Sequence, residues 1–235
     1  MLYVHETHHV IGKQEEAFVK TMKDDWLPLI EADGSSRVLW VWKQAHGTGP
    51  GYRYITLHQV EDWSAWGALA DAYHHKGSAL HDWYESAWKS RYKVESKLMT
   101  PVEWSPTPEL PPKGTAIDRA PTVYLHDVAH PFSGGVMKYI RTLGAEYFPY
   151  LGDHRMLSMK LCLRVAPGAG EPHEVVLVQK INDTDSFSRL LYAGEATPAS
   201  GQPTKGESNW MEVGLTVRDQ WLSQMFRTLR WSPLD

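Results

Sequence analysis

The chain of 235 residues has little cysteine, no long hydrophobic run and no excess of basic residues. Its one cysteine, Cys162, excludes an intramolecular disulfide, which is typical of proteins in a reducing compartment. Apolar runs reach only about five residues, too few for a helix that spans a membrane. The first residues also lack the basic and apolar segments of a secretory signal. These absences predict a cytoplasmic protein with no membrane partner.

Missing motifs argue against further functional classes. The net charge of −4 comes without a basic patch, which argues against a nucleic-acid partner. No Gly-x-Gly-x-x-Gly follows a predicted strand, and there is no Walker loop and no Gly-x-Ser-x-Gly. Diagnostic His-Glu-x-x-His and Cys/His metal motifs are missing too. By contrast, 42% hydrophobic and 22% charged residues predict a globular protein with a substantial core.

The sequence does contain an internal repeat, in which one pattern occurs twice. Under a shift of 121 positions, the opening strand 2–10 matches 123–130, pairing Tyr3 with Tyr124, His5 with His126, Glu6 with Asp127 and His9 with His130. After a six-residue insertion the shift is 127, and it pairs Trp83 with Trp210, Arg91 with Arg218 and Trp104-Ser105-Pro106 with Trp231-Ser232-Pro233. We therefore expect two tandem repeats, residues 1–106 and 122–235, joined by a proline-rich linker over 107–121.

Hydrophobic periodicity predicts the same element order in both repeats. In repeat 1 (residues 1–106) we expect a strand at 2–10, a helix at 13–30, a hairpin at 37–60, a helix from 63, a helical stretch at 78–96 and a strand at 98–104. In repeat 2 (residues 122–235) we expect a strand at 123–130, a helix at 135–151, a hairpin at 155–181, a helix from 183, a polar loop at 193–208, a helix at 210–224 and a strand at 225–231. In both last helices, Arg91 and Arg218 are expected to anchor the helix to the sheet edge.

This β-α-β-β-α-β order is ferredoxin-like, with helices on one face of an antiparallel sheet. The other face needs a covering layer, which the second repeat can supply. The predicted fold class is α+β: two tandem ferredoxin-like repeats that pack sheet-to-sheet as a pseudo-dimeric α+β barrel. The alternative is that the repeats pair between chains, and homo-oligomers of pseudo-dimers are compatible with either arrangement.

Short motifs in repeat 1 resemble the NIPSNAP-like branch of the dimeric α+β barrel superfamily. They are the opening Leu2-Tyr3 with Thr7-His8, then Gly12-Lys13 and Trp26, and finally the tail from Leu98 to Pro106. Repeat 2 keeps the Trp-Ser-Pro ending but loses Gly-Lys. The resemblance implies the barrel fold without implying one reaction, because the superfamily includes monooxygenases, polyketide cyclases and haem-handling proteins.

Histidines are the main chemical signal. Eight of the twelve lie in repeat 1, and His74, His75 and His81 occupy a segment that repeat 2 replaces with the polar loop. The segment resembles the neighbourhood in cyclase-type α+β barrels where a histidine and a tyrosine form an acid/base pair. Because a neutral imidazole exchanges protons near neutral pH, we expect His81 or His75 to be the general acid/base.

Strand alternation adds the residues of a candidate pocket between the sheet and the helices of repeat 1. The predicted catalytic residues are His81, His75, His5 and His58, and the predicted substrate-binding residues are Tyr54, Trp40, Trp42 and Tyr3. Aromatic walls with a few polar groups suit a small aromatic or hydrophobic ligand. An equally good interpretation of Trp40 and Trp42 is that they fill the core and line no pocket.

The sequence thus favours a small-molecule enzyme that uses histidine acid/base chemistry without a tightly bound cofactor. Its reaction would be of the cyclase, isomerase, lyase or cofactor-free monooxygenase type. One alternative is a haem- or divalent-metal-dependent enzyme with ligands among His5, His9, His126 and His130. The other is a non-catalytic module that binds a small ligand or a protein.

Overall fold

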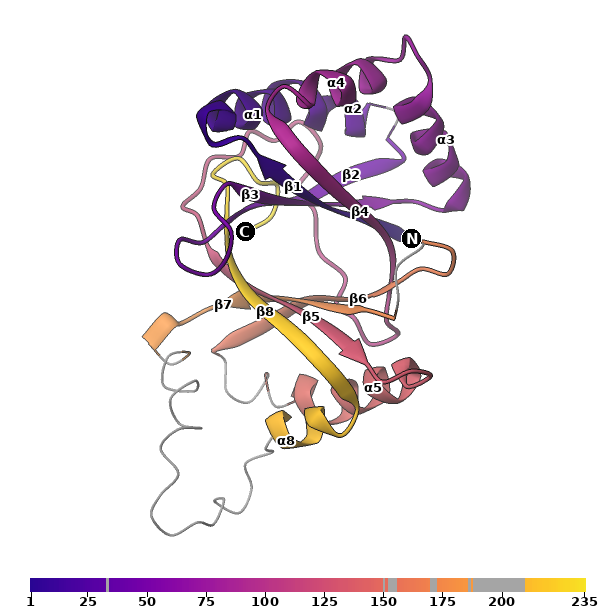
Figure 1. Cartoon of the computed structure of the whole chain (residues 1–235), viewed down its shortest axis with the longest axis vertical. Helices are drawn as coiled ribbons and strands as arrows, with labels where there is room; N and C mark the ends of the chain where they lie inside the picture. The colour runs from indigo at the N-terminus through magenta and orange to yellow at the C-terminus, as the bar shows by residue number, and fades with distance from the viewer. Residues whose placement is uncertain (33, 150, 152–155, 170–172, 186, 188–209) are drawn as a thin grey trace.

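The computed structural model describes residues 1–32, 34–149, 151, 156–169, 173–185, 187 and 210–235. The strands are β1 (Leu2–Val10), β2 (Ser36–Gln44), β3 (Arg53–Val60), β4 (Arg91–Pro101), β5 (Val123–Pro131), β6 (Leu157–Val165), β7 (Val175–Ile181) and β8 (Arg218–Thr228). They close into one barrel in the order β1-β3-β2-β8-β5-β7-β6-β4 (Figure 1). The predicted loop over residues 193–208 lies outside the described residues.

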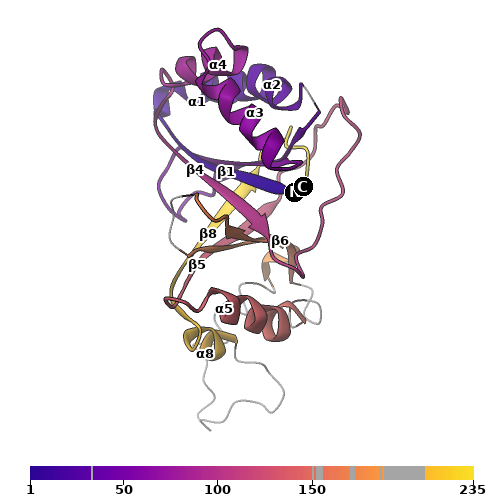
Figure 2. The same cartoon turned by 90° about the vertical axis from the view of Figure 1, so that its right-hand side faces the viewer.

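The helices lie outside the barrel. Those of repeat 1 are α1 (Glu15–Thr21), α2 (Leu27–Glu31), α3 (Trp63–His74) and α4 (Ala79–Ala87), with a π-helical turn at Met22–Trp26 between α1 and α2. Those described in repeat 2 are α5 (Val136–Thr142), a π-helical turn at Leu143–Tyr147 and α8 (Trp210–Leu215). Figure 2 shows the resulting layers: helices of repeat 1, the barrel, then α5 and α8. None of the described helices is long and apolar enough to cross a membrane.

Each repeat supplies four strands in the ferredoxin-like order, β4-β1-β3-β2 and β8-β5-β7-β6. The two sheets join at both edges, where β2 pairs with β8 and β4 pairs with β6 in antiparallel fashion. The barrel therefore has no free strand edge, which removes the unpaired backbone groups that an open sheet would expose. The predicted α+β fold, two ferredoxin-like repeats packed sheet-to-sheet, is confirmed.

Period-two alternation divides the side chains between the barrel lumen and the helix layers. The core inside the barrel includes Tyr3, Trp40, Trp42, Leu57, Met99, Tyr124, Leu161 and Phe226. The core under the helices of repeat 1 includes Val10, Phe18, Met22, Trp26, Tyr54 and Trp83. A third core, under the helices of repeat 2, includes Tyr139, Tyr147, Cys162 and Trp210. Cys162 is fully buried in this third core.

Both predicted last helices are too long. The helix expected over 78–96 ends at Ala87, and the strand begins at Arg91 rather than at 98. The helix expected over 210–224 ends at Leu215, and its strand begins at Arg218. Pairing with β1 and β5 overrides the local helical preference of these charged segments. Arg91 and Arg218 therefore begin strands, and their predicted role as helix anchors is wrong.

The Trp-Ser-Pro motif that ends each repeat ties it to the other repeat. The Ser105 hydroxyl accepts a hydrogen bond from the Cys162 backbone N–H at 2.9 Å, and the Ser232 hydroxyl accepts one from Val41 N–H at 3.1 Å. Cys162 is the counterpart of Val41 in the repeat. Each serine thus satisfies a strand N–H next to a β-bulge in the opposite sheet.

We expect Ser232→Ala and Ser105→Ala each to lower the free energy of unfolding by about 1–2 kcal/mol, because a buried backbone N–H loses its acceptor. Urea denaturation followed by tryptophan fluorescence measures this change. Ser64→Ala, at an exposed position of α3, is the control and should leave the midpoint unchanged. Equal midpoints for all three variants would contradict this account of the motif.

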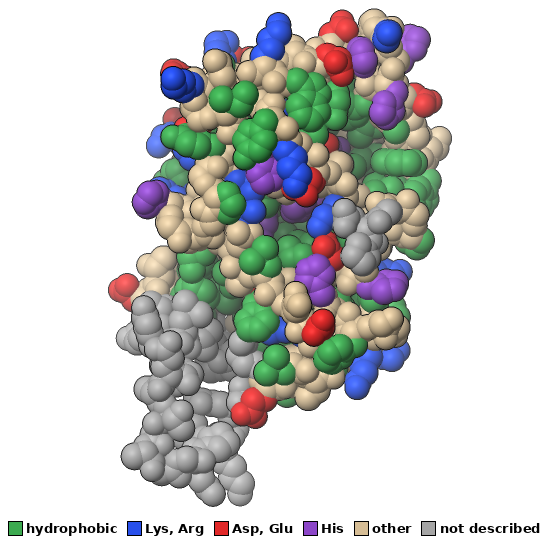
Figure 3. Space-filling view, viewed as in Figure 1, with side chains coloured by type: hydrophobic (Ala, Val, Ile, Leu, Met, Phe, Trp, Pro, Cys, Tyr) green, Lys and Arg blue, Asp and Glu red, His purple; other side chains and the backbone are tan. Residues whose placement is uncertain are grey.

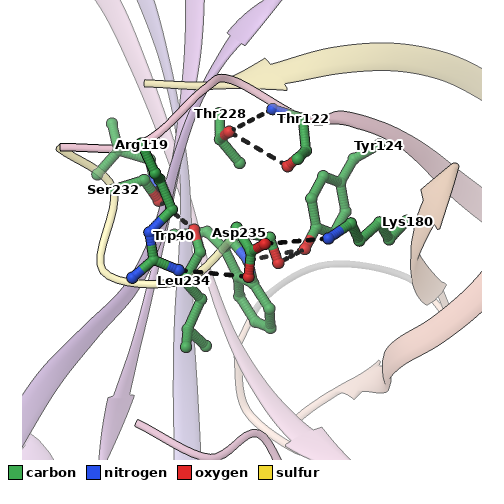
Figure 4. Close-up of polar contacts among 10 residues, drawn as sticks. Trp40, Arg119, Thr122, Tyr124, Lys180, Thr228, Ser232, Leu234 and Asp235 are labelled. Carbon is green, nitrogen blue, oxygen red and sulfur yellow. Dashed lines mark hydrogen bonds and ion pairs between the residues drawn. The ribbon is translucent and has the colours of Figure 1, made fainter. Parts of the chain in front are cut away.

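One end of the lumen is closed by the segment that follows β8 (Figure 4). The Trp40 indole N–H donates to the Tyr124 hydroxyl at 3.1 Å, and Tyr124 donates to the Asp235 backbone oxygen at 2.5 Å. The Asp235 carboxylate pairs with Lys180 at 3.1 Å and with Arg119 at 3.3 Å. The stacked Trp40 and Trp42 rings, 5.3 Å apart, fill the volume behind this closure.

Candidate functional site

A group of polar side chains, buried except for the half-buried Tyr73, lies between the sheet and the helices of repeat 1. We call it the helix-side cluster; its members are Glu6 and His8 on β1, Thr56 and His58 on β3, Arg91 on β4 and Tyr73 on α3. Glu6, Thr56 and Ser96 are neighbours across three strands, which places them on one face of the sheet. The cluster therefore arises from strand register, and α3 adds Tyr73 from above.

His8 is held in one tautomer. Arg91 Nη1 donates to His8 Nδ1 at 2.9 Å, and because a guanidinium cannot accept, the imidazole proton sits on Nε2. His8 Nε2 then donates to Thr56 Oγ1 at 3.3 Å. Burial, reinforced by the positive charge of Arg91, holds the pKa of His8 well below its usual range. His8 is consequently a neutral, oriented group whose two nitrogens are both occupied.

Glu6 is the one carboxyl group of the cluster. One of its oxygens lies 3.9 Å from His8 Nε2, and the side chain is only 9% exposed. Burial raises the pKa of Glu6, while Arg91 and a hydrogen bond from Ser96 oppose the shift without cancelling it. A buried carboxyl with a raised pKa can take or give a proton closer to neutral pH than an exposed one.

The upper part of the cluster is aromatic. The Trp26 indole N–H donates to the Tyr73 hydroxyl at 3.0 Å, and burial raises the pKa of Tyr73 so that the hydroxyl stays protonated. The His58 ring meets Trp26 edge-on at 5.9 Å. Neither ring nitrogen of His58 has a hydrogen-bond partner among the described residues, and burial lowers the pKa of His58 to about 3. His58 is thus neutral and has a free donor and a free acceptor.

Arg91 connects the cluster to the outer surface. Its guanidinium lies 5.4 Å from the Trp83 ring, 4.6 Å from Tyr84 and 5.0 Å from Trp88, which is 39% exposed. Such cation–π contacts stabilise a buried positive charge at modest desolvation cost. Within the part of the chain that the structure describes, Arg91 Nε has no acceptor.

Repeat 2 keeps the acid and the arginine of this cluster but not its histidines. Asp127 replaces Glu6 and Arg218 replaces Arg91, while Ala129 stands in the place of His8 and Leu177 in that of Thr56. Gln179, the counterpart of His58, donates to Asp127 at 2.8 Å and accepts from the Tyr147 hydroxyl at 2.6 Å. The two repeats therefore differ in chemistry at one shared scaffold, and repeat 1 carries the imidazoles.

The sheet separates the predicted pocket residues into two groups. Tyr54 and His58 lie on the helix side, where the Tyr54 hydroxyl donates to Glu15 at 2.7 Å. Tyr3, Trp40, Trp42 and His5 lie on the lumen side, where His5 faces His126 with ring centres 6.3 Å apart. The expectation of a single pocket lined by all of them is wrong, because neighbouring strands present opposite faces at those positions.

The two histidines predicted as general acid/base lie beside the cluster rather than in it. His81 on α4 is half-buried, and its Nδ1 donates to the Tyr73 carbonyl at 3.0 Å. His75 is exposed where α3 ends. Their catalytic roles stay predictions. Sequence reasoning did not select four residues of the cluster: Glu6, His8, Tyr73 and Arg91. The recurrence of Glu6 as Asp127 and of Arg91 as Arg218 was a signal that could have indicated two of them.

The four histidines considered as metal or haem ligands do not converge. His9 Nε2 donates to Glu95 at 3.1 Å, and His130 lies 3.9 Å from Glu174. The His126 ring is enclosed by Trp42 at 4.4 Å and Phe226 at 4.7 Å, which leaves no room for a porphyrin beside it. Among the described residues, no group of three or more His, Cys, Asp or Glu is placed to hold a metal ion. These residues do not fit haem.

A cavity of about 220 Å³ lies elsewhere, between α2, the linker and the segment after β8. It is lined by Lys23, Leu27, Glu31, Arg37, Trp231 and residues 111–112 and 114–117 among others. Arg37 there is engaged by Glu31 at 3.4 Å and by the Pro111 carbonyl at 2.8 Å. We interpret this cavity as a gap left between packed segments and not as a binding site.

No family model and no curated protein sequence matches the chain. A candidate monooxygenase from Fusobacterium nucleatum has a similar structure, with a TM-score of 0.61 at 9% identity over 99% of this chain and 94% of that chain. An anthrone oxidase-like protein gives 0.58 at 9% identity over 97% and 91%. A NIPSNAP domain protein from Burkholderia xenovorans matches 46% of this chain and 100% of its own, at 18% identity and a TM-score of 0.39. The chain thus has the fold of the dimeric α+β barrel proteins, with both halves of the barrel supplied by one polypeptide.

Proposed function

We propose that this protein is a cofactor-independent enzyme that removes a proton from a small aromatic substrate in the helix-side cluster of repeat 1. The observation that carries the proposal is the buried Glu6 carboxyl, whose pKa is raised by burial and which lies beside a neutral, oriented His8. Glu6 is the proton acceptor. Arg91, through its Nε–H, which has no acceptor among the described residues, stabilises the negative charge that develops on a substrate oxygen.

An aromatic substrate fits the surroundings of these groups. Trp26 and Trp83 have ring centres 6.0 Å apart, and Phe18 lies 5.5 Å from the His8 ring. Flat apolar walls around a few polar groups favour a flat organic molecule. The similar anthrone oxidase-like and monooxygenase-like structures suggest the same substrate class for this chain, and that likeness is one of fold.

Access to the cluster requires movement of α3. No side chain of this helix is fully buried, so α3 is held less firmly than the sheet below it. Gly77, with φ of 95°, lies in the turn that separates α3 from α4 and supplies a conformation that other residues rarely adopt. Outward displacement of α3 would withdraw Tyr73 and open the space above Glu6.

Anthrone with dioxygen is the substrate pair for the test. Glu6 takes one proton from the methylene carbon, and the resulting carbanion is oxidised by dioxygen. One oxygen atom remains on that carbon as the new carbonyl of anthraquinone, and the other leaves as water with the two methylene hydrogens. Formation of anthraquinone above the spontaneous rate, with one dioxygen consumed per product, is the expected result. A rate equal to that of buffer with any of a panel of anthrones would contradict the proposal.

On the acid side of the profile of kcat/KM against pH, the rise in kcat/KM should follow the ionisation of Glu6. Because a proton acceptor must be ionised, kcat/KM rises with pH through the pKa of Glu6 in the free enzyme. Burial raises this pKa, so the limb is expected above the ordinary range for a glutamate of about 4.3. Initial rates between pH 4 and 8, corrected for the spontaneous reaction, measure the position of this limb. A limb below the ordinary carboxyl range would argue against Glu6.

A further inference from the structure

The open end of the barrel lumen carries a second set of polar groups, on the opposite face of the sheet from the helix-side cluster. Four side chains form what we call the rim: Arg53, Gln224, Lys97 and Glu174. The repeat relates Arg53 to Glu174 and Lys97 to Gln224. In the space-filling view the surface is hollowed between the two halves, and histidine and hydrophobic side chains are visible in the hollow beside charged ones (Figure 3).

The two halves of the rim are equivalent in position but not in charge. Lys97 forms an ion pair with Glu174, which is buried. At the related place Arg53 donates to the neutral amide of Gln224, and its Nε has no acceptor among the described residues. Outside the rim, Lys93 pairs with Glu95 at 2.9 Å. Among the described residues, Lys97 and Lys93 each have a carboxylate partner, whereas Arg53 has no direct ion-pair partner.

Directly below the rim lie His5 and His126, which are 6% and 3% exposed. Burial lowers the pKa of both, that of His5 to about 4, so each ring is neutral. Within the described part of the chain neither nitrogen of His126 has a partner, and the Trp42 indole N–H has none. Buried polar groups without partners are costly, and a bound molecule with polar atoms would satisfy them.

Aromatic rings connect the unpaired arginine to the unpaired histidine. The Arg53 guanidinium lies 5.3 Å from the Phe226 ring, and the His126 ring lies 4.7 Å from Phe226 and 4.4 Å from Trp42. The positive charge, an apolar surface and the hydrogen-bonding groups thus follow one another inward from the rim. This order matches a molecule with an anionic end and a flat apolar body.

We infer that the lumen binds a small aromatic monocarboxylate, with the carboxylate on Arg53, the ring against Phe226 and a polar substituent or water on His126. A planar guanidinium binds a carboxylate with two parallel hydrogen bonds. A metal ion is a poorer match, since the described residues offer two histidines and no third ligand. A doubly charged phosphate would be only half neutralised by the single positive charge of Arg53.

Isothermal titration with benzoate tests the inference, and Gln224→Glu is the decisive variant. The new carboxylate would give Arg53 the ion pair that Lys97 already has with Glu174, so the fold is retained while the binding charge is neutralised. We expect benzoate to bind the wild type, and its Kd to rise by about tenfold or more in Gln224→Glu and in Arg53→Gln. Lys93→Gln, at the exposed Lys93–Glu95 pair, should change the Kd by less than about twofold.

Benzyl alcohol, which lacks the charge, should bind all four proteins equally weakly. Glu6→Gln should bind benzoate like the wild type, because Glu6 lies on the other face of the sheet, and this separates the inference from the proposed function. No benzoate binding at millimolar concentration would overturn the inference. Equal benzoate affinity of the wild type and Gln224→Glu would overturn it as well.

Discussion

Replacing Glu6 by glutamine should lower kcat/KM for anthrone oxidation by about a hundred- to ten-thousand-fold, the usual contribution of a general base. Glutamine keeps the size of the side chain and can still accept from Ser96, but it cannot take a proton. Since the charged form of Glu6 is disfavoured by burial, the amide should not destabilise the fold. Oxygen consumption and anthraquinone absorbance measure the loss, and the thermal midpoint shows that the variant is folded.

Asp127→Asn is the matched control, because the repeat places Asp127 where Glu6 stands. Burial raises the pKa of Asp127 in the same direction, yet no histidine accompanies it. The variant should therefore keep wild-type kcat/KM. If both variants lost activity equally, the acid pair would be structural in both repeats. If Glu6→Gln remained fully active, Glu6 would not be the proton acceptor.

Arg91→Ala should be the most destabilising single change, by about 3–5 kcal/mol, as expected for removal of one member of a buried charged network. The substitution leaves His8 Nδ1 without its donor, removes the charge that opposes the buried Glu6 carboxylate, and opens a cavity between Trp83 and Tyr84. For a chain of this size the thermal midpoint should fall by roughly 10 °C.

Differential scanning calorimetry measures this loss, with Arg230→Ala as the control. Arg230 bonds Asp118 on the surface, where an ion pair contributes little, and its removal should leave the midpoint unchanged. Lowering the pH to protonate Glu6 should recover part of the stability of Arg91→Ala, because the uncompensated carboxylate becomes neutral. A variant with the wild-type midpoint would show that Arg91 does not hold the cluster together.

Much of the fold was predictable from local patterns. Alternation in residues 2–10 places Tyr3 and His5 on one face of the strand and Leu2 and Val4 on the other. The structure shows the same arrangement. The internal repeat predicted two equivalent sheets, which form the two halves of the barrel. Residues 91–96 belong to the helix predicted over 78–96. They form a strand because β1 supplies hydrogen bonds that no local pattern reveals.

The candidate site was less predictable. Histidine content directed attention to repeat 1, where the helix-side cluster lies, but to His75 and His81 instead of His8 and Glu6. Glu6 and Arg91 are 85 positions apart in the chain, and only the pairing of β1 with β4 places them together. At the rim the same holds for Arg53 and Gln224, which meet across the junction of the two repeats.

The sequence by itself therefore determined the element order, the duplication and which residues of a predicted strand share a face, because all three follow from periodicity within a short segment or between two copies of it. Tertiary structure alone decided which face looks into the barrel and which lies under the helices. It also decided which acid meets which arginine, because strand register and barrel closure join residues that are distant in the chain, and burial then sets their charge.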